Sequence, residues 1–223
     1  MKSFFRSSIG RKVAMALSGV FLVVFLAQHF IINITSVFSE SIFNMLSHFM
    51  GNNPIVQFIL QPILIAGVLF HFIMGFVLEW QNRQARPVSY AKFKGSRNSL
   101  FVSRNMIISG IVILSFLVLH FYDFWVPEMD YKYVQSLPED PNRYYDELIH
   151  KFENPIRVGI YCLSFIFLSL HLVHGFSSSM QSLGTNNKYA EIIKKISYSF
   201  GIGIPLGFCF IALYHFILHY NTI

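Results

Sequence analysis

Apolar residues run through this chain in five long stretches, and the short segments between them hold most of the charge. Each stretch is close to the ~20 residues that a helix needs to cross a bilayer. The five stretches lie at about 13–38, 56–80, 104–126, 156–180 and 197–219. The pattern predicts an all-α integral membrane protein with five transmembrane helices, built as a single domain over residues 1–223. The first stretch has no small-residue cleavage site, so we expect it to be retained rather than removed as a signal peptide.

Composition and charge agree with this class and add an orientation. Hydrophobic residues make up 54% of the chain and charged residues 13%, a balance that excludes an ordinary soluble domain. Of the 17 Lys and Arg residues, 13 fall on the side of the membrane that holds the N-terminus. The positive-inside rule makes that side cytoplasmic. Membrane topology thus explains the net charge of +6, and we expect no nucleic-acid partner.

The longest connection, at about 124–155, lies on the opposite, outer side and is acidic. Within it, the text YYDELIHKF predicts a short amphipathic helix at the membrane interface, which would cap the outer end of the protein. An ordinary solvated loop is the alternative.

Four histidines lie inside the apolar stretches, where an ionisable side chain marks a functional site by default. His29 and His120 are each about 24 Å from the cytoplasmic start of their stretches, at the helical rise per residue. His71 and His171 are each about 13–14 Å from the cytoplasmic ends of theirs. The first four helices can therefore form a bundle that holds an outer pair, His29 and His120, and an inner pair, His71 and His171.

Two neutral imidazoles on opposite faces of an iron porphyrin form a six-coordinate centre suited to electron transfer. The chain has no CxxCH motif, so we expect two b-type haems without covalent attachment. Gly75 and Gly175 each follow an inner histidine by four residues and remove bulk on the same helix face. Close approach of a macrocycle explains this spacing, and so does ordinary packing of membrane helices.

The remaining histidines fit less well. His174 lies about 9 Å deep, three residues after His171, and is the alternative ligand in the fourth stretch. We prefer His171 because its depth and its glycine offset match those of His71. His215 and His219 have no partner at their level, and we expect both to be interfacial.

At these residues the chain resembles the di-haem cytochrome b membrane anchor of succinate:quinone oxidoreductases, that is, of succinate dehydrogenase and fumarate reductase. The resemblance covers nearly the whole chain and is closest to the single-polypeptide, five-helix form of Bacteroidetes-type bacteria. It rests on the four histidines and on the texts SIGRKVAMALSG, QNRQARP, SRNMIISGIVILSFLVLHFYDFW and LHLVHGFSSSMQSLG. It implies the bacterial inner membrane as the location.

The resemblance also implies the ligands and the partners. Axial ligation pairs His29 with His120 and His71 with His171, and the distance back from Leu183 selects His171 over His174. A flavoprotein subunit on the cytoplasmic face would carry out the dicarboxylate chemistry, and an iron–sulfur subunit on the same face would pass electrons to the anchor. The anchor would pass electrons between the iron–sulfur subunit and a membrane quinone, which the family implies to be menaquinone.

Further contacts follow as expectations. The inner face would dock the iron–sulfur subunit, although the positive-inside rule explains the same charges; its candidate side chains are Arg83, Arg86, Lys92, Lys94 and Arg97. Haem propionates need cationic partners, for which the candidates are Lys12, Arg83 and Arg104. The titratable candidates for a quinone site near the outer pair are Glu40, His48 and Asp123, with solvated interfacial side chains as the alternative.

Other classes compete with this reading. The haem-b subunit of a membrane hydrogenase or formate dehydrogenase also uses intramembrane histidines. A histidine-bearing transporter or channel usually adds carboxylates within its spans, whereas Glu79 and Asp123 lie at span ends here. A di-iron membrane oxidase needs clustered HxxHH-type motifs, and the sequence has none.

Overall fold

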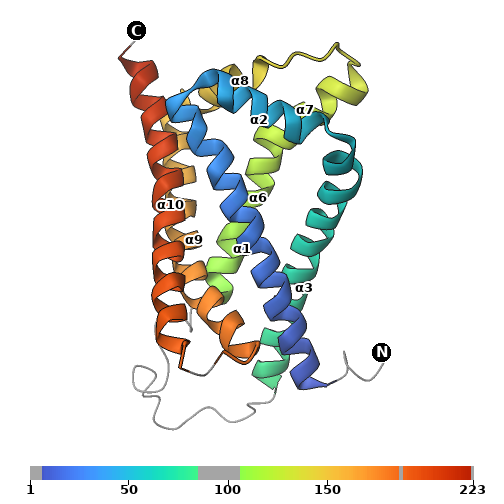
Figure 1. Ribbon diagram of the computed structural model, residues 1–223, viewed down its shortest axis with the longest axis vertical. Coiled ribbons are helices and arrows are strands. Elements are labelled where there is room, and N and C mark those ends of the chain that lie inside the picture. The colour runs from blue at the N-terminus through green and yellow to red at the C-terminus, as the bar shows by residue number, and fades with distance from the viewer. Residues whose placement is uncertain (1–6, 85–105, 186–187, 222–223) are drawn as a thin grey trace.

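The computed structural model describes residues 7–84, 106–185 and 188–221, and it contains helices and no strands in these ranges. Five helical runs are long and apolar enough to cross a membrane, which confirms the all-α membrane class. They are α1 (Ser8–Phe38), η1 with α3 (Val56–Leu60 and Gln61–Gln84), α6 with its extension (Met106–Val134), α9 (Pro155–Ser182) and α10 (Ala190–Tyr220). Figure 1 shows them side by side as an elongated bundle.

The third helical run is longer than predicted. After α6 (Met106–His120) it continues through η2 (Phe121–Trp125), α7 (Val126–Met129) and η3 (Asp130–Val134). Pro127 has no N–H to donate to the helix, but a wider turn just before it joins the Val126 N–H to the carbonyl of Phe121. Such a π-turn lets a helix pass a proline without ending. The predicted outer connection at 124–155 was therefore wrong in its first part, and the irregular backbone within it is limited to 135–142 and 153–154.

Two short helices cross the end of the bundle opposite the N-terminus, which we call the far end (Figure 1). Helix α8 (Arg143–Phe152) confirms the helix predicted from YYDELIHKF, and its Leu148 and Phe152 are buried in the core. Helix α2 (Glu40–Asn52) was not predicted; it begins directly after α1 because the Ser39 hydroxyl caps it by accepting from the Ile42 N–H at 3.3 Å.

The buried side chain of Asn44 ties the two short helices together. The Asn44 side chain donates to the carbonyl of Asn142 at 3.0 Å and accepts from the N–H of Tyr145 at 2.8 Å. Because Asn44 is 3% exposed, these bonds are shielded from water and hold α8 against α2. The far end is thus a closed cap over the bundle.

The most extensive helix contact joins α9 and α10, and α1 packs against α3, α9 and α10. The buried core lies towards the far end and is dominated by aromatic residues such as Tyr161, Phe165 and Phe208. Large apolar side chains elsewhere point outward, as expected for helices that face lipid. The predicted four-helix bundle is therefore completed by the fifth helix, which covers the side of α1 and α9.

The glycines of α10 provide a test of this packing. A Cβ at Gly201 would lie 2.8 Å from the backbone nitrogen of Val173, whereas one at Gly203 would meet nothing within 4 Å. We expect Gly201→Ala to lower the free energy of unfolding by about 1–3 kcal/mol, because the backbone of α9 must move away. Gly203→Ala should change it by less than about 0.5 kcal/mol. Thermal unfolding in detergent compares the two, and equal effects would contradict a close α9–α10 contact at Gly201.

Candidate functional site

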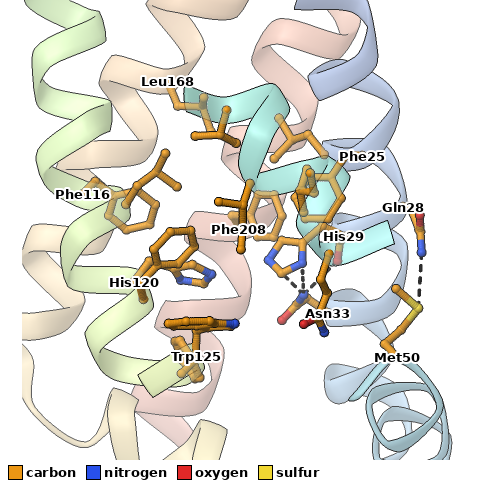
Figure 2. A pocket seen from close by; sticks show the side chains of 18 of the residues that line it. Phe25, Gln28, His29, Asn33, Met50, Phe116, His120, Trp125, Leu168 and Phe208 are labelled. Atoms are coloured by element: carbon orange, nitrogen blue, oxygen red, sulfur yellow. Dashed lines mark hydrogen bonds between the residues drawn. The ribbon is translucent and has the colours of Figure 1, made fainter. Parts of the chain in front are cut away.

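The four membrane histidines meet in two pairs inside the bundle. The ring centroids of His29 on α1 and His120 on α6 are 5.8 Å apart, and those of His71 on α3 and His171 on α9 are 6.3 Å apart. These are the pairs that depth along the sequence predicts. Figure 2 shows His29 and His120 pointing into the same cavity from opposite walls.

Both separations suit two imidazoles that share one metal ion. A metal–imidazole bond of about 2.0–2.1 Å, taken twice, with about 1 Å from each nitrogen to its ring centre, places the centroids about 6 Å apart. Each pair supplies only two nitrogen ligands, so the ion must bring its other ligands with it, as the iron of a haem does. The donor set and the spacing thus fit an axially coordinated haem.

The outer pair lies in a cavity of about 540 Å³, within the range of ligand and cofactor sites. Phe25 stacks on His29 and Phe116 stacks on His120, at centroid distances of 5.5 and 5.7 Å. Phe208 of α10 lies 5.7 Å from the His29 ring and closes another side (Figure 2). The wall is mainly apolar, which suits a macrocycle and excludes water from the ligands.

Serine hydroxyls lie against the inner pair. The Ser18 Oγ of α1 is 3.0 Å from the Nδ1 of His71, and the Ser109 Oγ of α6 is 3.2 Å from the Nδ1 of His171. Both serines are buried. Each inner histidine is therefore held by a helix other than the one that carries its partner histidine.

A repeat in the sequence gives rise to this symmetry and was missed by the sequence analysis. The segments MALSGVFLVVFLAQHF (15–30) and MIISGIVILSFLVLHF (106–121) share Met, Ser, Gly, Phe, Leu, His and Phe at equal positions. They place a serine on the inner level and a histidine, eleven residues later, on the outer level. Aligning these two stretches in full would have found the serines.

The two predicted glycines also occupy equivalent places. A Cβ at Gly75 would lie 3.6 Å from the Cε of Met15, and one at Gly175 would lie 3.1 Å from the Cε of Met106. Both glycines thus face the flexible tip of a methionine, a side chain that readily changes its packing. Space for a macrocycle at these glycines stays a prediction.

The ring that faces His71 belongs to His171. His174 is only partly buried, and when the texts around His71 and His171 are aligned its counterpart is Met74. The geometry therefore supports His171 as the member of the inner pair.

His215, which we expected to be interfacial, is buried inside the protein. It is 1% exposed, and its Nε2 lies 2.9 Å from the Oγ of Ser36. The rings of Tyr145 and Tyr214 enclose it, with centroids at 5.7 and 5.3 Å. Helix α8 brings Tyr145 over the end of α10, a tertiary contact that depth along the helix does not reveal. His219 lies closer to the end of α10, with its Nδ1 3.7 Å from the Glu153 carboxylate.

The three predicted quinone residues are not brought together. Glu40 begins α2 and is exposed, while the Nδ1 of His48 on α2 is 2.7 Å from the Asn52 amide nitrogen. Asp123 is 1% exposed, so the solvated alternative is wrong for this residue. Tyr161 donates to the Asp123 Oδ2 at 2.9 Å, and the Arg157 Nε is 3.2 Å from the same oxygen.

A different carboxylate lines the cavity of the outer pair. Glu128 belongs to that wall together with Gln28 and Gln61, and the guanidinium of Arg143 pairs with it. Burial, together with the charge of Glu128, raises the pKa of Tyr144 to about 12. The polar part of the wall therefore lies at the far end, where α8 covers it, and this carboxylate was missed because it sits beyond the expected end of the third helix.

Two of the predicted propionate partners, Lys12 and Arg83, lie at the other end of the bundle. Lys12 is exposed, Arg83 is exposed and pairs with Glu79 at 2.7 Å, and Arg104 lies outside the described residues. The predicted docking residues Arg86, Lys92, Lys94 and Arg97 also lie outside them. Arg11 of α1, which the sequence analysis did not single out, has a buried Nε without a hydrogen-bond partner in the part of the chain that the structure describes. That nitrogen is a donor suited to an anionic group in the protein interior.

The fold and the site define a multi-pass helical membrane protein with two intramembrane histidine pairs. Comparisons with family models, with curated proteins and with solved structures found no match.

Proposed function

We propose that this protein is a di-haem cytochrome b that anchors a succinate:quinone oxidoreductase in the bacterial inner membrane. The observation that carries the proposal is the pairing of four membrane histidines from four helices, with ring centroids 5.8 and 6.3 Å apart. A metal site with only two protein ligands per ion, in a mainly apolar bundle, is what a bis-histidine haem requires. The resemblance at SIGRKVAMALSG and LHLVHGFSSSMQSLG adds the enzyme class.

Haem iron, when bound, supplies a one-electron carrier on each level of the membrane. His29 and His120 would hold the outer iron, and His71 and His171 the inner one. With two imidazoles holding each iron, the paired histidines would leave no protein-facing site for oxygen or another exogenous ligand. The aromatic wall of Phe25, Phe116 and Phe208 keeps water from the outer site.

At the N-terminal side, Arg11 is the side chain that best fits a haem propionate, because its Nε is buried and has no hydrogen-bond partner among the described residues. It precedes Ser18 by seven residues, two helical turns, and so lies on the same face of α1. The basic residues of this side would face the iron–sulfur subunit, which receives electrons from the flavoprotein that oxidises succinate. Electrons would enter at the inner pair and leave at the outer pair, or run in reverse during fumarate reduction.

We place the quinone, by family menaquinone, at the far end beside the outer pair. The cavity there joins an apolar wall to the polar side chains Gln28, Gln61 and Glu128. A quinone needs this combination of an apolar slot and a few hydrogen-bonding groups. Glu40, His48 and Asp123 remain candidates for proton exchange around it.

A reduced-minus-oxidised spectrum of the chain, purified with the subunits that accompany it, tests the proposal. We expect the α-band of b-type haem and two haems per polypeptide in a pyridine haemochrome assay. Succinate-dependent quinone reduction should accompany these haems, whereas hydrogen- or formate-dependent reduction would identify one of the competing haem-b subunits. A folded preparation without haem would overturn the proposal and favour the transporter alternative.

A further inference from the structure

The inner and outer histidine pairs differ in what their second ring nitrogen contacts. The Nδ1 atoms of His71 and His171 lie 3.0 and 3.2 Å from serine hydroxyls. The Nδ1 of His120 is buried without a hydrogen-bond partner among the described residues. The amide nitrogen of Asn33 lies 3.5 Å from the Nδ1 of His29 and 3.4 Å from its Nε2. An amide nitrogen is a donor and cannot accept from an imidazole N–H.

The direction of the serine bonds follows from counting protons. A serine hydroxyl carries one proton, and Ser18 donates it to the carbonyl of Met15 at 2.8 Å. Ser109 does the same to the carbonyl of Met106 at 2.9 Å. The hydroxyl oxygens can then only accept from the histidines. The proton of each inner imidazole is therefore held on Nδ1, and the lone pair on Nε2 is left for a metal.

We propose that Ser18 and Ser109 are positioning residues that fix the tautomer of the inner histidines and lower the reduction potential of the inner haem. This inference rests on the proposed function. An Nδ1–H bond to an acceptor makes the imidazole a more basic ligand. A more basic ligand stabilises ferric over ferrous iron, so the potential falls. Since the outer pair has no comparable acceptor among the described residues, this effect is confined to the inner level.

The sequence repeat argues against an accidental contact between serine and histidine, because the serine occurs in both copies. A serine followed by a glycine occurs twice, as Ser18-Gly19 and Ser109-Gly110, and in both copies the serine lies eleven residues before an outer histidine. A Cβ at Gly19 would lie 3.6 Å from the Cε1 of His71, and a Cβ at Gly110 would lie 3.9 Å from that of His171. Both distances are in the range of ordinary van der Waals contact, so each imidazole lies directly against the helix that carries its serine.

The test is a potentiometric titration of the haems in Ser18→Ala, Ser109→Ala and the double variant, with the full chain and its partner subunits. We expect the midpoint potential of one haem to rise in each single variant and to rise further in the double variant. A tenfold change in the oxidation equilibrium would correspond to about 59 mV for this one-electron couple. The low-spin ferric EPR signal of the same haem should shift, and the other haem should keep both its potential and its signal.

Ser164→Ala is the matched control. Ser164 is as buried as Ser109 and donates to the carbonyl of Ile160 at 2.7 Å, but it has no histidine partner among the described residues. This variant should leave both potentials unchanged. Ser18→Thr and Ser109→Thr, which keep the hydroxyl, should retain the wild-type potential.

Each outcome decides between the claims. Unchanged potentials and EPR signals in haem-replete alanine variants would overturn the serine proposal and leave the cytochrome proposal intact. If an alanine variant does not bind the inner haem at all, haem binding by the matching threonine variant would support a role for the hydroxyl group. Loss of the haem in both variants would show that the serine is needed for packing and would overturn the proposal. Absence of haem from the folded wild-type protein would contradict the proposed function itself.

Discussion

Replacing His71 or His171 with alanine is expected to reduce the haem content from two to one per polypeptide. In the proposed cytochrome, each histidine would provide one of two protein ligands to its haem, and the ring that faces His71 in the described bundle is that of His171. With alanine in place of one of them, the site would keep a single protein ligand and would hold the inner haem poorly. His29→Ala and His120→Ala should remove the outer haem in the same way. Pyridine haemochrome counts and EPR spectra of the four variants measure this.

His174→Ala serves as the control within the same helix. Its side chain is partly buried and its position in the repeat corresponds to Met74, so both haems should be retained. Loss of the inner haem in His174→Ala, with both haems present in His171→Ala, would show that the ligand in α9 had been assigned to the wrong histidine.

Replacing Arg157 with leucine is expected to lower the free energy of unfolding by about 3–5 kcal/mol. The side chain of Asp123 is 0% exposed and pairs with the Arg157 Nε at 3.2 Å. Without the guanidinium, the hydroxyl of Tyr161 is the remaining partner of the carboxylate among the described residues, in an interior where an unpaired charge is costly. Thermal or denaturant unfolding of the purified protein in detergent measures the loss.

A double-mutant cycle separates the ion pair from general damage. Asp123→Asn alone should also destabilise, but the double variant with Arg157→Leu should lose less than the sum of the two single losses. Tyr161→Phe removes one hydrogen bond to a charged group and should lower the free energy of unfolding by about 1.5–3 kcal/mol. If the losses of Asp123→Asn and Arg157→Leu were strictly additive, the two side chains would not be coupled.

The membrane helices and the two histidine pairs were predicted from the length of the apolar stretches and from the depth of each histidine along its helix. Runs of about 20 apolar residues are readable as helices because a bilayer forces every backbone group to be satisfied within its own segment. Depth along a helix is a linear function of residue number, so His29 and His120, or His71 and His171, could be matched in level before any packing was known. The observed pairs have the same members.

The errors in the predicted helix boundaries lie at the ends of the membrane helices, where the length needed to cross a bilayer does not determine the structure. The third helix passes Pro127 by means of a wider turn, and this placed Glu128 in a helix rather than in a loop. The capping hydroxyl of Ser39 starts α2 directly after α1. Hydrogen bonds of one or two residues determine where such helices begin and end, and the hydropathy of the sequence does not reveal these bonds.

By itself the sequence determined the class of the protein, the number of its membrane helices and the levels of its four central histidines, since each depends only on composition and helical rise. Only the tertiary structure decided which side chains meet across helices. It buried His215 beside Ser36, joined Asp123 to Arg157 and placed Ser18 against His71. The rotation and crossing of packed helices set these contacts, and they join residues up to 179 positions apart, beyond the reach of any local pattern.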